Sequence, residues 1–152
     1  MKLQGAVTVS AAREQVWQVL LDPAQLCRVI PGCEQARQLD DTHYEADLSV
    51  KVQFMTVRSH AKGTLLEVEA PRRLVGELVG EPLAMAGAFR ARVTLELISQ
   101  DAATTVVHYT MDLTLVGRLA SLGEAIVRST SQKLSRQFAD NIASLFRSSD
   151  PL

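Results

Sequence analysis

Cys27 and Cys33 are the chain's only cysteines, and they flank the Pro31-Gly32 pair in the stretch AQLCRVIPGC. A metal site needs three or four converging ligands, and no histidine or third cysteine completes such a set here. A disulfide between the two is geometrically conceivable, but a reducing cytoplasm disfavours it. We therefore expect a short apolar helix that ends at Pro31-Gly32, with both thiols free.

The other side chains that could do chemistry do not form a recognisable site. The histidines lie at a turn or at polar positions of alternating segments, which predicts surface positions for His43, His60 and His108. Asp40-Asp41 is typical of a turn. Ser129-Thr130-Ser131 lies within a helical pattern without a neighbouring base, and the sequence has no G-x-S-x-G motif. We expect no catalytic group, no metal and no cofactor.

Composition restricts the class of protein. The chain has 152 residues, of which 47% are hydrophobic and 22% charged, with a formal net charge of −1. That length suits one domain over residues 1–152, and the charge offers no basic field for nucleic acid. The N-terminus does not resemble a signal peptide, and no apolar stretch is long enough to cross a bilayer. We expect a cytoplasmic protein.

The start of the chain predicts a strand followed by two short helices. Apolar residues alternate from Leu3 to Val9, which indicates a half-buried strand. Ser10 is a good N-cap for a helix after this strand. Asp22-Pro23 indicates the start of a second helix, because a cap residue followed by proline is typical of that position.

The rest of the chain changes from a period of two to a period near four. Clear strand-like alternation covers 43–54, 88–97 and 105–115, and weaker alternation covers 33–40, 57–70 and 72–80. A helix of about residues 118–147 follows. The order predicts an α+β helix-grip fold, in which a curved antiparallel sheet of about six to seven strands wraps around the long C-terminal helix.

Such a sheet can leave a pocket that its own side chains do not fill. Ser129-Thr130-Ser131 interrupts the apolar stripe of the last helix, so small residues would leave space there, and Thr130 would offer a hydrogen bond. Alternatively, Thr130 bonds back to its own helix and the core is filled. The ligand-binding candidates are Trp17, Leu26, Ile30, Val50, Val52, Phe54, Met85, Phe89, Val93, Tyr109, Met111, Leu122, Ile126, Thr130 and Leu134.

Three groups of residues have a specific expected role. The hydroxyl of Tyr109 needs a partner if it is buried, and with Thr130 and Trp17 it could orient a carbonyl-bearing ring. Leu26 and Ile30 would form part of a lid near the opening of the pocket. The apolar loop EPLAMAGAF, residues 81–89, would either gate the pocket or dock a partner, and burial in a longer hairpin is the alternative.

Four motifs carry a resemblance to a known family: VTVSAAREQVWQVLLDPAQL followed by VIPGC, then KGTLLEVEAP, TTVVHYTMDLTLVGRLASLG and QFADNIASLF. Over about residues 3 to 147 the chain resembles the G-subunit family of carbon monoxide dehydrogenase, within the START-like (SRPBCC, Bet v 1-like) superfamily. Two departures stand out. The loop VGEPLAMAGAF is not glycine-rich as is typical of the family, and the chain ends at SSDPL without the hydrophobic tail that attaches many members to a membrane.

The resemblance implies a non-enzymatic carrier of a quinone- or lipid-like molecule. Its partner would be a molybdenum-containing carbon monoxide dehydrogenase or related hydroxylase, which the carrier would link to the membrane. Without the tail we expect only peripheral contact at the inner face of the membrane. An assembly or recruitment factor with an incidental cavity is the alternative. A cofactorless enzyme would need an inward acid or base, whereas the alternation places almost all ionisable residues outside.

Overall fold

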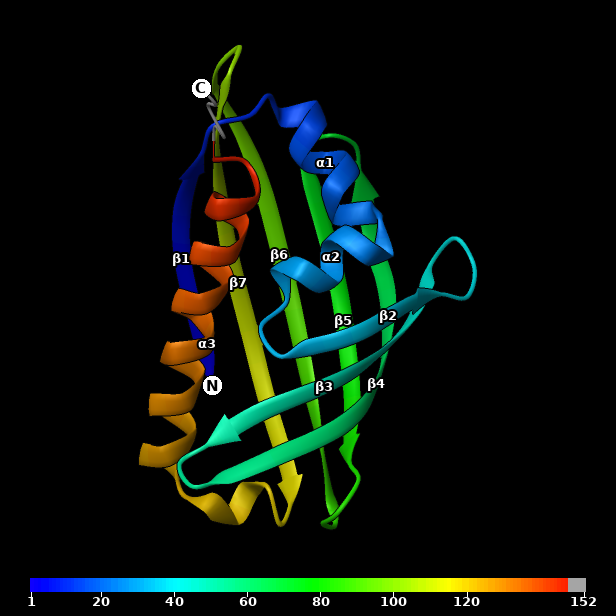
Figure 1. Cartoon of the computed structure of the whole chain (residues 1–152), viewed down its shortest axis with the longest axis vertical. Helices are drawn as coiled ribbons and strands as arrows, with labels where there is room; N and C mark the ends of the chain where they lie inside the picture. Colours follow the sequence, from blue (N-terminus) through cyan, green and yellow to red (C-terminus); the bar gives the residue numbers. More distant parts are fainter. Residues whose placement is uncertain (148–152) are drawn as a thin grey trace.

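Seven antiparallel strands form one curved sheet in the order β1-β7-β6-β5-β4-β3-β2 (Figure 1). The strands are β1 (Lys2–Val9), β2 (Cys33–Gln38), β3 (His43–Val52), β4 (Met55–Glu69), β5 (Arg73–Pro82), β6 (Gly87–Asp101) and β7 (Thr104–Gly117). The helical elements are α1 (Arg13–Leu21), α2 (Pro23–Val29), the short 3-10 helix η1 (Ala120–Leu122) and α3 (Glu124–Leu145). The computed structural model describes residues 1–147, so SSDPL, on which the expectation of a missing tail rested, lies outside the described residues.

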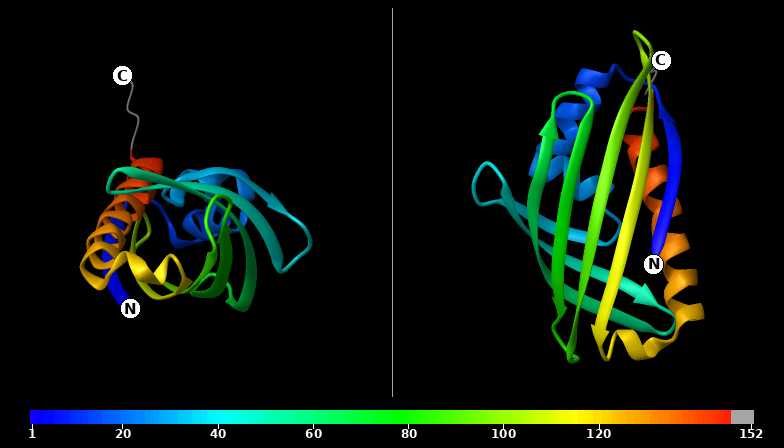
Figure 2. Two further views of the ribbon diagram at one scale, coloured as in Figure 1. Left: turned by 90° about the horizontal axis from the view of Figure 1, so that it is seen from below. Right: turned by 180° about the vertical axis from the view of Figure 1, so that it is seen from behind.

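The three longer helices cover the concave face of this sheet unevenly. α1 packs on β6 and β7 at the end of the molecule that is uppermost in Figure 1, and α2 lies below it and packs on β2. α3 runs along β1, touches α2 near its C-terminal end and touches β3 on its other side. The sheet curves round so that β2 and β3 cross in front of the longer strands in Figure 1 and behind them in the right view of Figure 2. This arrangement confirms the predicted helix-grip fold.

Local signals explain where α1 and α2 begin. Asp22 is the N-cap of α2, as predicted, and its side chain accepts a hydrogen bond from the Ala24 N–H at 3.0 Å. The prediction that Ser10 caps α1 is wrong, because the N-cap is Ala12. The Ala12 N–H instead donates to the side-chain oxygen of Gln15 at 3.2 Å, which reaches back from the first turn.

The long C-terminal helix starts later than the periodicity predicted. Gly117 and Gly123 have positive φ angles of 69° and 97°, so the chain turns at both positions between β7 and α3. A Cβ atom on Gly117 would lie 2.7 Å from the Cα of Gly87, so the close approach of the two strands also requires glycine there. Leu122 therefore lies in η1, outside α3.

Cys27 and Cys33 form a disulfide, with their Cα atoms 5.2 Å apart. The prediction of free thiols is wrong. The prediction rested on the reducing compartment that we expected. The distance between the two cysteines depends instead on the path of the chain, because Gly32, with a φ of 77°, reverses the chain between α2 and β2. The bond joins the last turn of α2 to the first residue of β2.

The best packed part of the core lies under α1 and α2. Its buried side chains come from both helices, from the adjoining ends of the strands and from the last turns of α3: Val9, Ala11, Val16, Trp17, Leu20, Val29, Leu74, Leu95, Leu97, Val107 and Ile142. Hydrogen bonds fix the helices over it. The Thr105 hydroxyl, which is fully buried, donates to the Ala11 carbonyl at 2.8 Å, and the Asn141 amide donates to the Val29 carbonyl at 3.1 Å.

Candidate ligand cleft beside the C-terminal helix

We call the part of the concave face around Phe89, Ala91 and Val93 of β6 the lower half, as oriented in Figure 1, and the part around Leu95 and Leu97 the upper half. The lower half is apolar and only half buried. Strand register aligns its side chains in rows, with Phe89 between Gly80 and Leu115, Ala91 between Leu78 and Leu113, and Val93 between Gly76 and Met111. Of these side chains only Ala91 is buried, whereas Leu95 and Leu97, farther along the same face of β6, are buried. Solvent therefore reaches part of this apolar surface, although Leu78 and Phe89 also pack against the buried Ala46, Leu48 and Ala61 of β3 and β4.

Missing side chains on β5 contribute to this space. Gly76 and Gly80 occupy inward positions where a half-buried strand normally places large apolar residues. A Cβ atom on Gly76 would meet nothing closer than the Thr64 carbonyl oxygen at 3.6 Å, so there is room beside it. The ring of Phe89 lies over Gly80 and would overlap any side chain there. Neither glycine was among the predicted site residues, although both stand at the apolar positions of LVGELVG.

A cleft of about 230 Å³ lies between the end of β3 and the middle of α3. Its lining combines apolar, hydroxyl, amide and ammonium groups from Gly32, Ser49, Val50, Lys51, Thr130, Lys133, Leu134 and Gln137. Three candidates from the sequence, Val50, Thr130 and Leu134, meet here although β3 and α3 lie far apart in the chain. Pockets for drug-sized ligands are usually about 300–1,000 Å³. This cleft therefore suits a ring or a headgroup rather than a whole isoprenoid chain.

Thr130 and its two neighbouring serines differ in burial. Ser131 is the buried member of the hydroxyl triplet at 2% exposure, Ser129 is exposed, and Thr130 is half buried at the edge of the cleft. Successive helical residues point about 100° apart, which accounts for the difference. The small side chain that the last helix buries is thus Ser131, one residue after the one we singled out.

Tyr109 connects the sheet to α3. Its hydroxyl lies 3.1 Å from the Ser135 Oγ, and its ring packs edge-on against Phe138 at 5.0 Å between centroids. The ring also covers Gly5 on the neighbouring strand β1. Within the described residues, no hydrogen bond joins Tyr109, Thr130 and Trp17, and Trp17 lies in the upper core. That these three groups orient one ring stays a prediction.

Phe54 does not face the interior, contrary to the prediction. β3 ends at Val52, which is buried, and Gln53 adopts a φ of 56° in a tight turn that pairs Val52 with Met55. The turn places Phe54 at its tip with 101% exposure. The predicted strand 43–54 is therefore two residues too long, and the alternation that indicated an inward Phe54 no longer applies after Val52.

The remaining candidates are half buried and come from four regions. Leu26 and Ile30 lie on α2 and at its end, and Met85 lies in the connection from β5 to β6. Phe89, Val93 and Met111 line the rows described above. Leu122 and Ile126 lie in η1 and the first turn of α3. Contact of any of them with a ligand stays a prediction.

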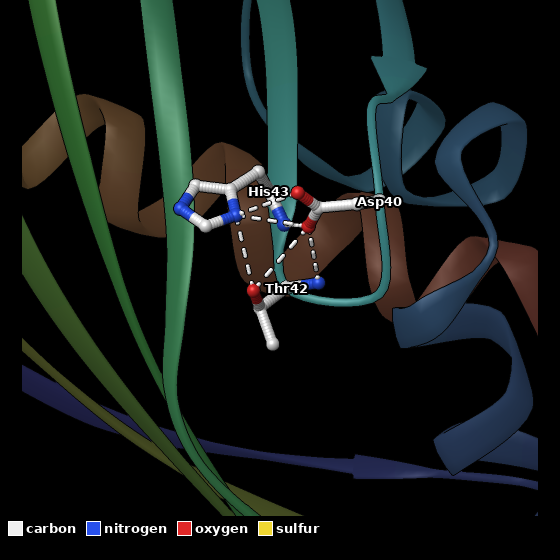
Figure 3. Close-up of polar contacts among 3 residues, drawn as sticks. All are labelled: Asp40, Thr42 and His43. Carbon is white, nitrogen blue, oxygen red and sulfur yellow. Dashed lines mark hydrogen bonds and ion pairs between the residues drawn. The ribbon is translucent and has the colours of Figure 1, made fainter.

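Polar clusters occur on the outside of the molecule. Asp40 forms the turn between β2 and β3, where one carboxylate oxygen accepts the N–H groups of Thr42 and His43, each at 2.9 Å (Figure 3). The Thr42 N–H and the His43 side chain lower the pKa of Asp40. This turn confirms the interpretation of Asp40-Asp41. On β4, His60 lies 3.0 Å from Asp47 and 3.6 Å from Glu45.

Metal-binding clusters and membrane-crossing helices do not occur in the described part of the chain. Residues 1–147 contain no group of three or more His, Cys, Asp or Glu side chains placed to hold a metal ion. No helix in the same range combines the length and the apolar character that a bilayer crossing requires.

Solved structures share this architecture, and they show that the chain has a START-like fold. A conserved protein from Geobacillus kaustophilus superposes with a TM-score of 0.84 at 21% identity, covering 96% of this chain and 95% of the other. A START superfamily protein from Mycobacterium smegmatis gives 0.75 at 9% identity, covering 95% and 96%. The ZhuI aromatase/cyclase from Streptomyces sp. R1128 gives 0.73 at 14% identity, covering 100% and 99%. At these identities the likeness shows the fold alone.

The sequence itself identifies the family. The profile of the carbon monoxide dehydrogenase G-subunit family (CoxG) matches residues 5–146. The chain therefore belongs to the CoxG family, as its motifs indicated. No curated protein sequence matches the chain.

Proposed function

We propose that this protein is a non-enzymatic carrier of a quinone- or lipid-like molecule. It would associate with a molybdenum-containing carbon monoxide dehydrogenase or a related hydroxylase and link that enzyme to the membrane. The observation that carries the proposal is the half-exposed apolar lower half of the concave face, with the β3–α3 cleft beside it. Membership of the CoxG family supports the choice of partner.

Desolvation would supply the binding energy. Each Å² of apolar surface removed from water contributes about 25 cal/mol, so a ligand ring covering the rows of Phe89, Val93 and Met111 gains affinity without a specific polar contact. The cleft adds polar groups at one edge. Thr130 and Gln137 can hydrogen bond to a carbonyl oxygen, and Val50 and Leu134 can pack on the ring that bears it.

The inward-facing chemistry favours binding over catalysis. The inward positions of β5, β6 and β7 carry no Asp, Glu, His, Lys or Arg. Among the described residues, the buried polar side chains are Ser59, Thr105 and Ser131, none of which is ionisable near neutral pH. General acid–base catalysis needs such a group within hydrogen-bonding reach of the substrate.

Two measurements test this function. Native mass spectrometry of the purified chain should find a co-purifying apolar molecule, and a short-chain ubiquinone analogue should quench the fluorescence of Trp17, the chain's single tryptophan. Gly76→Leu should weaken quinone binding about tenfold, since it fills space that the ligand would use. Thr110→Leu, which places the same side chain on the exposed outer face of β7, should leave quinone binding unchanged. Absence of both a bound molecule and quenching would sink the proposal.

A recruitment or assembly factor is the second candidate. The modest volume of the cleft favours it, because about 230 Å³ does not enclose a long isoprenoid. If Gly76→Leu abolished quinone binding while the chain still co-purified fully with the dehydrogenase and restored its activity, recruitment would replace transport as the function.

A further inference from the structure

The lower end of the molecule exposes the two most solvent-accessible large apolar side chains of the described chain. Phe54 at the β3–β4 turn is 101% exposed, and Leu83 in the β5–β6 connection is 71% exposed. Met55 and Val116 at the same end are 40% and 52% exposed. We call this surface the lower rim and define it as residues 51–58, 81–88 and 116–124. Figure 2, left, seen from below, shows the connections that form it.

Both tips are held in place by the sheet. The turn that carries Phe54 is closed by the pair Val52 and Met55, which leaves two residues between the strands. The Leu83 N–H donates to the Arg58 carbonyl at 2.8 Å, which fixes the second tip to β4. The high exposure of both side chains shows that no element of the described chain covers them, so their apolar surface is presented to whatever the lower rim meets.

Basic side chains outnumber acidic ones at the lower rim. The rim carries Lys51, Arg58 and Arg118, none of which forms an ion pair within residues 1–147, and its acidic residue Glu124 is paired with Arg128. Glu81 is its other acidic residue. The connections at the other ends of the strands carry Asp40, Asp41 and Asp101, whereas Glu67 and Glu69 form ion pairs with Arg72 and Arg73 beside them. In a protein of net charge −1, the lower rim therefore presents three basic side chains that are unpaired within residues 1–147.

We propose that the lower rim docks on the anionic headgroups of a lipid bilayer, with Phe54 and Leu83 inserted at the interface. Basic residues beside exposed aromatic and aliphatic tips match such a surface, because anionic lipids attract Lys and Arg while the interface accepts the apolar tips. The occupant we commit to is the bilayer, because the exposed apolar tips are accompanied by Lys51, Arg58 and Arg118, which have no ion-pair partner within residues 1–147. The inference rests on the proposed carrier function, since Lys51 belongs to both the rim and the cleft.

Vesicle co-sedimentation of the full chain tests the docking. Vesicles of phosphatidylglycerol and phosphatidylcholine should bind the protein, and pure phosphatidylcholine vesicles should bind it much more weakly. The double variant Phe54→Ser with Leu83→Ser should reduce binding to the anionic vesicles at least about tenfold. Arg58→Gln should reduce it about fivefold, as expected for one basic residue at an anionic surface, and added salt should have a similar effect.

Control variants come from the β2–β3 and β4–β5 connections, at the ends of the strands away from the lower rim. Leu39 is 55% exposed beside Asp40, and Val68 is 49% exposed between Glu67 and Glu69. The double variant Leu39→Ser with Val68→Ser also removes two exposed apolar side chains and should leave vesicle binding unchanged. Equal losses in both double variants, or equal binding to neutral and anionic vesicles, would overturn the docking surface. Circular dichroism should show that both double variants are folded, as expected for changes at exposed positions.

Trp17 quenching by the ubiquinone analogue in the absence of vesicles separates this inference from the proposed function. Quinone binding without vesicle binding overturns the docking surface and leaves the carrier in place. Vesicle binding without quinone binding removes the carrier and retains the surface. If the intact chain ignores vesicles and the Phe54 and Leu83 variants lose the dehydrogenase instead, the rim is a protein interface and the inference is wrong.

Discussion

The two halves of the concave face have the same kind of sequence and different degrees of burial. β6 places Leu97 and Leu95 at one end of its inward face and Val93 and Phe89 at the other, with the same alternation throughout. The first pair is buried and the second is half exposed. The covering elements differ, since α1 packs on the upper part of β6 and β7, whereas β2 and β3 cross in front of the strands below it (Figure 1).

This comparison shows that an apolar side chain on the concave face need not contribute its full burial energy to the stability of the fold. The upper half gains its burial energy on folding, when its side chains leave water. The lower half keeps part of that energy available, because its apolar surface remains accessible after folding. A carrier needs both, a packed region that fixes the sheet and an unpacked region that a ligand can cover.

The largest expected effect tests the comparison directly. Leu97→Ala removes a side chain that is 1% exposed, so it should lower the free energy of unfolding by about 2–5 kcal/mol. Leu113→Ala on the lower half should cost about 1 kcal/mol or less, because less apolar surface is lost and no closed cavity forms. Urea unfolding of both variants gives the two values. Equal costs would contradict the difference between the halves.

A second variant tests how the upper helices are held. Thr105→Val removes the hydroxyl that donates to the Ala11 carbonyl and leaves a buried acceptor without its partner. The expected loss of stability is about 1–3 kcal/mol. Thr114→Val, at an exposed position of the same strand, is the control and should change the unfolding midpoint little. A negligible loss in Thr105→Val would mean that this contact does not anchor the start of α1.

The alternating pattern was sufficient for the fold because each antiparallel strand buries one parity. It could not show which half of that parity is covered, since this depends on where α1 and α2 pack. Phe54 illustrates a second limit. The segment VKVQFM contains no glycine, asparagine or proline to mark a turn, and Gln53 adopts the positive φ that the hairpin requires.

The candidate site was predicted in part for the same reason. Val50, Thr130 and Leu134 share the cleft because their positions on β3 and α3 follow from regular periodicity. Gly76 and Gly80 were missed because the space they leave depends on neighbouring strands. The disulfide was missed because the prediction considered the expected compartment. The turn at Gly32, which brings the two cysteines together, was not considered.

Tyr109 lies at the boundary between the halves and gives a smaller effect. Tyr109→Phe removes the hydrogen bond to Ser135 and retains the ring packed on Phe138 and over Gly5, so the expected cost is about 1 kcal/mol. Thermal unfolding measures this cost, and quinone binding should stay unchanged, because the hydroxyl is already engaged with α3. A large loss of quinone affinity would return this hydroxyl to the ligand site.

The smallest expected effect concerns the polar turn at Asp40, which belongs to neither half. Hydrogen bonds from the Thr42 N–H and the His43 side chain hold the pKa of Asp40 below its usual 3.8 in the folded protein. A carboxyl with a lowered folded pKa stabilises the protein above its unfolded pKa, and this contribution is lost as the pH falls through the folded value.

Asp40→Ala should therefore lower the urea midpoint slightly at pH 7 and make little difference in the most acidic range where the protein stays folded. Asp41→Ala, whose carboxylate accepts no hydrogen bond within residues 1–147, is the control. A deficit of Asp40→Ala that persisted unchanged at low pH would assign the effect to the geometry of the turn, since protonation would then play no part.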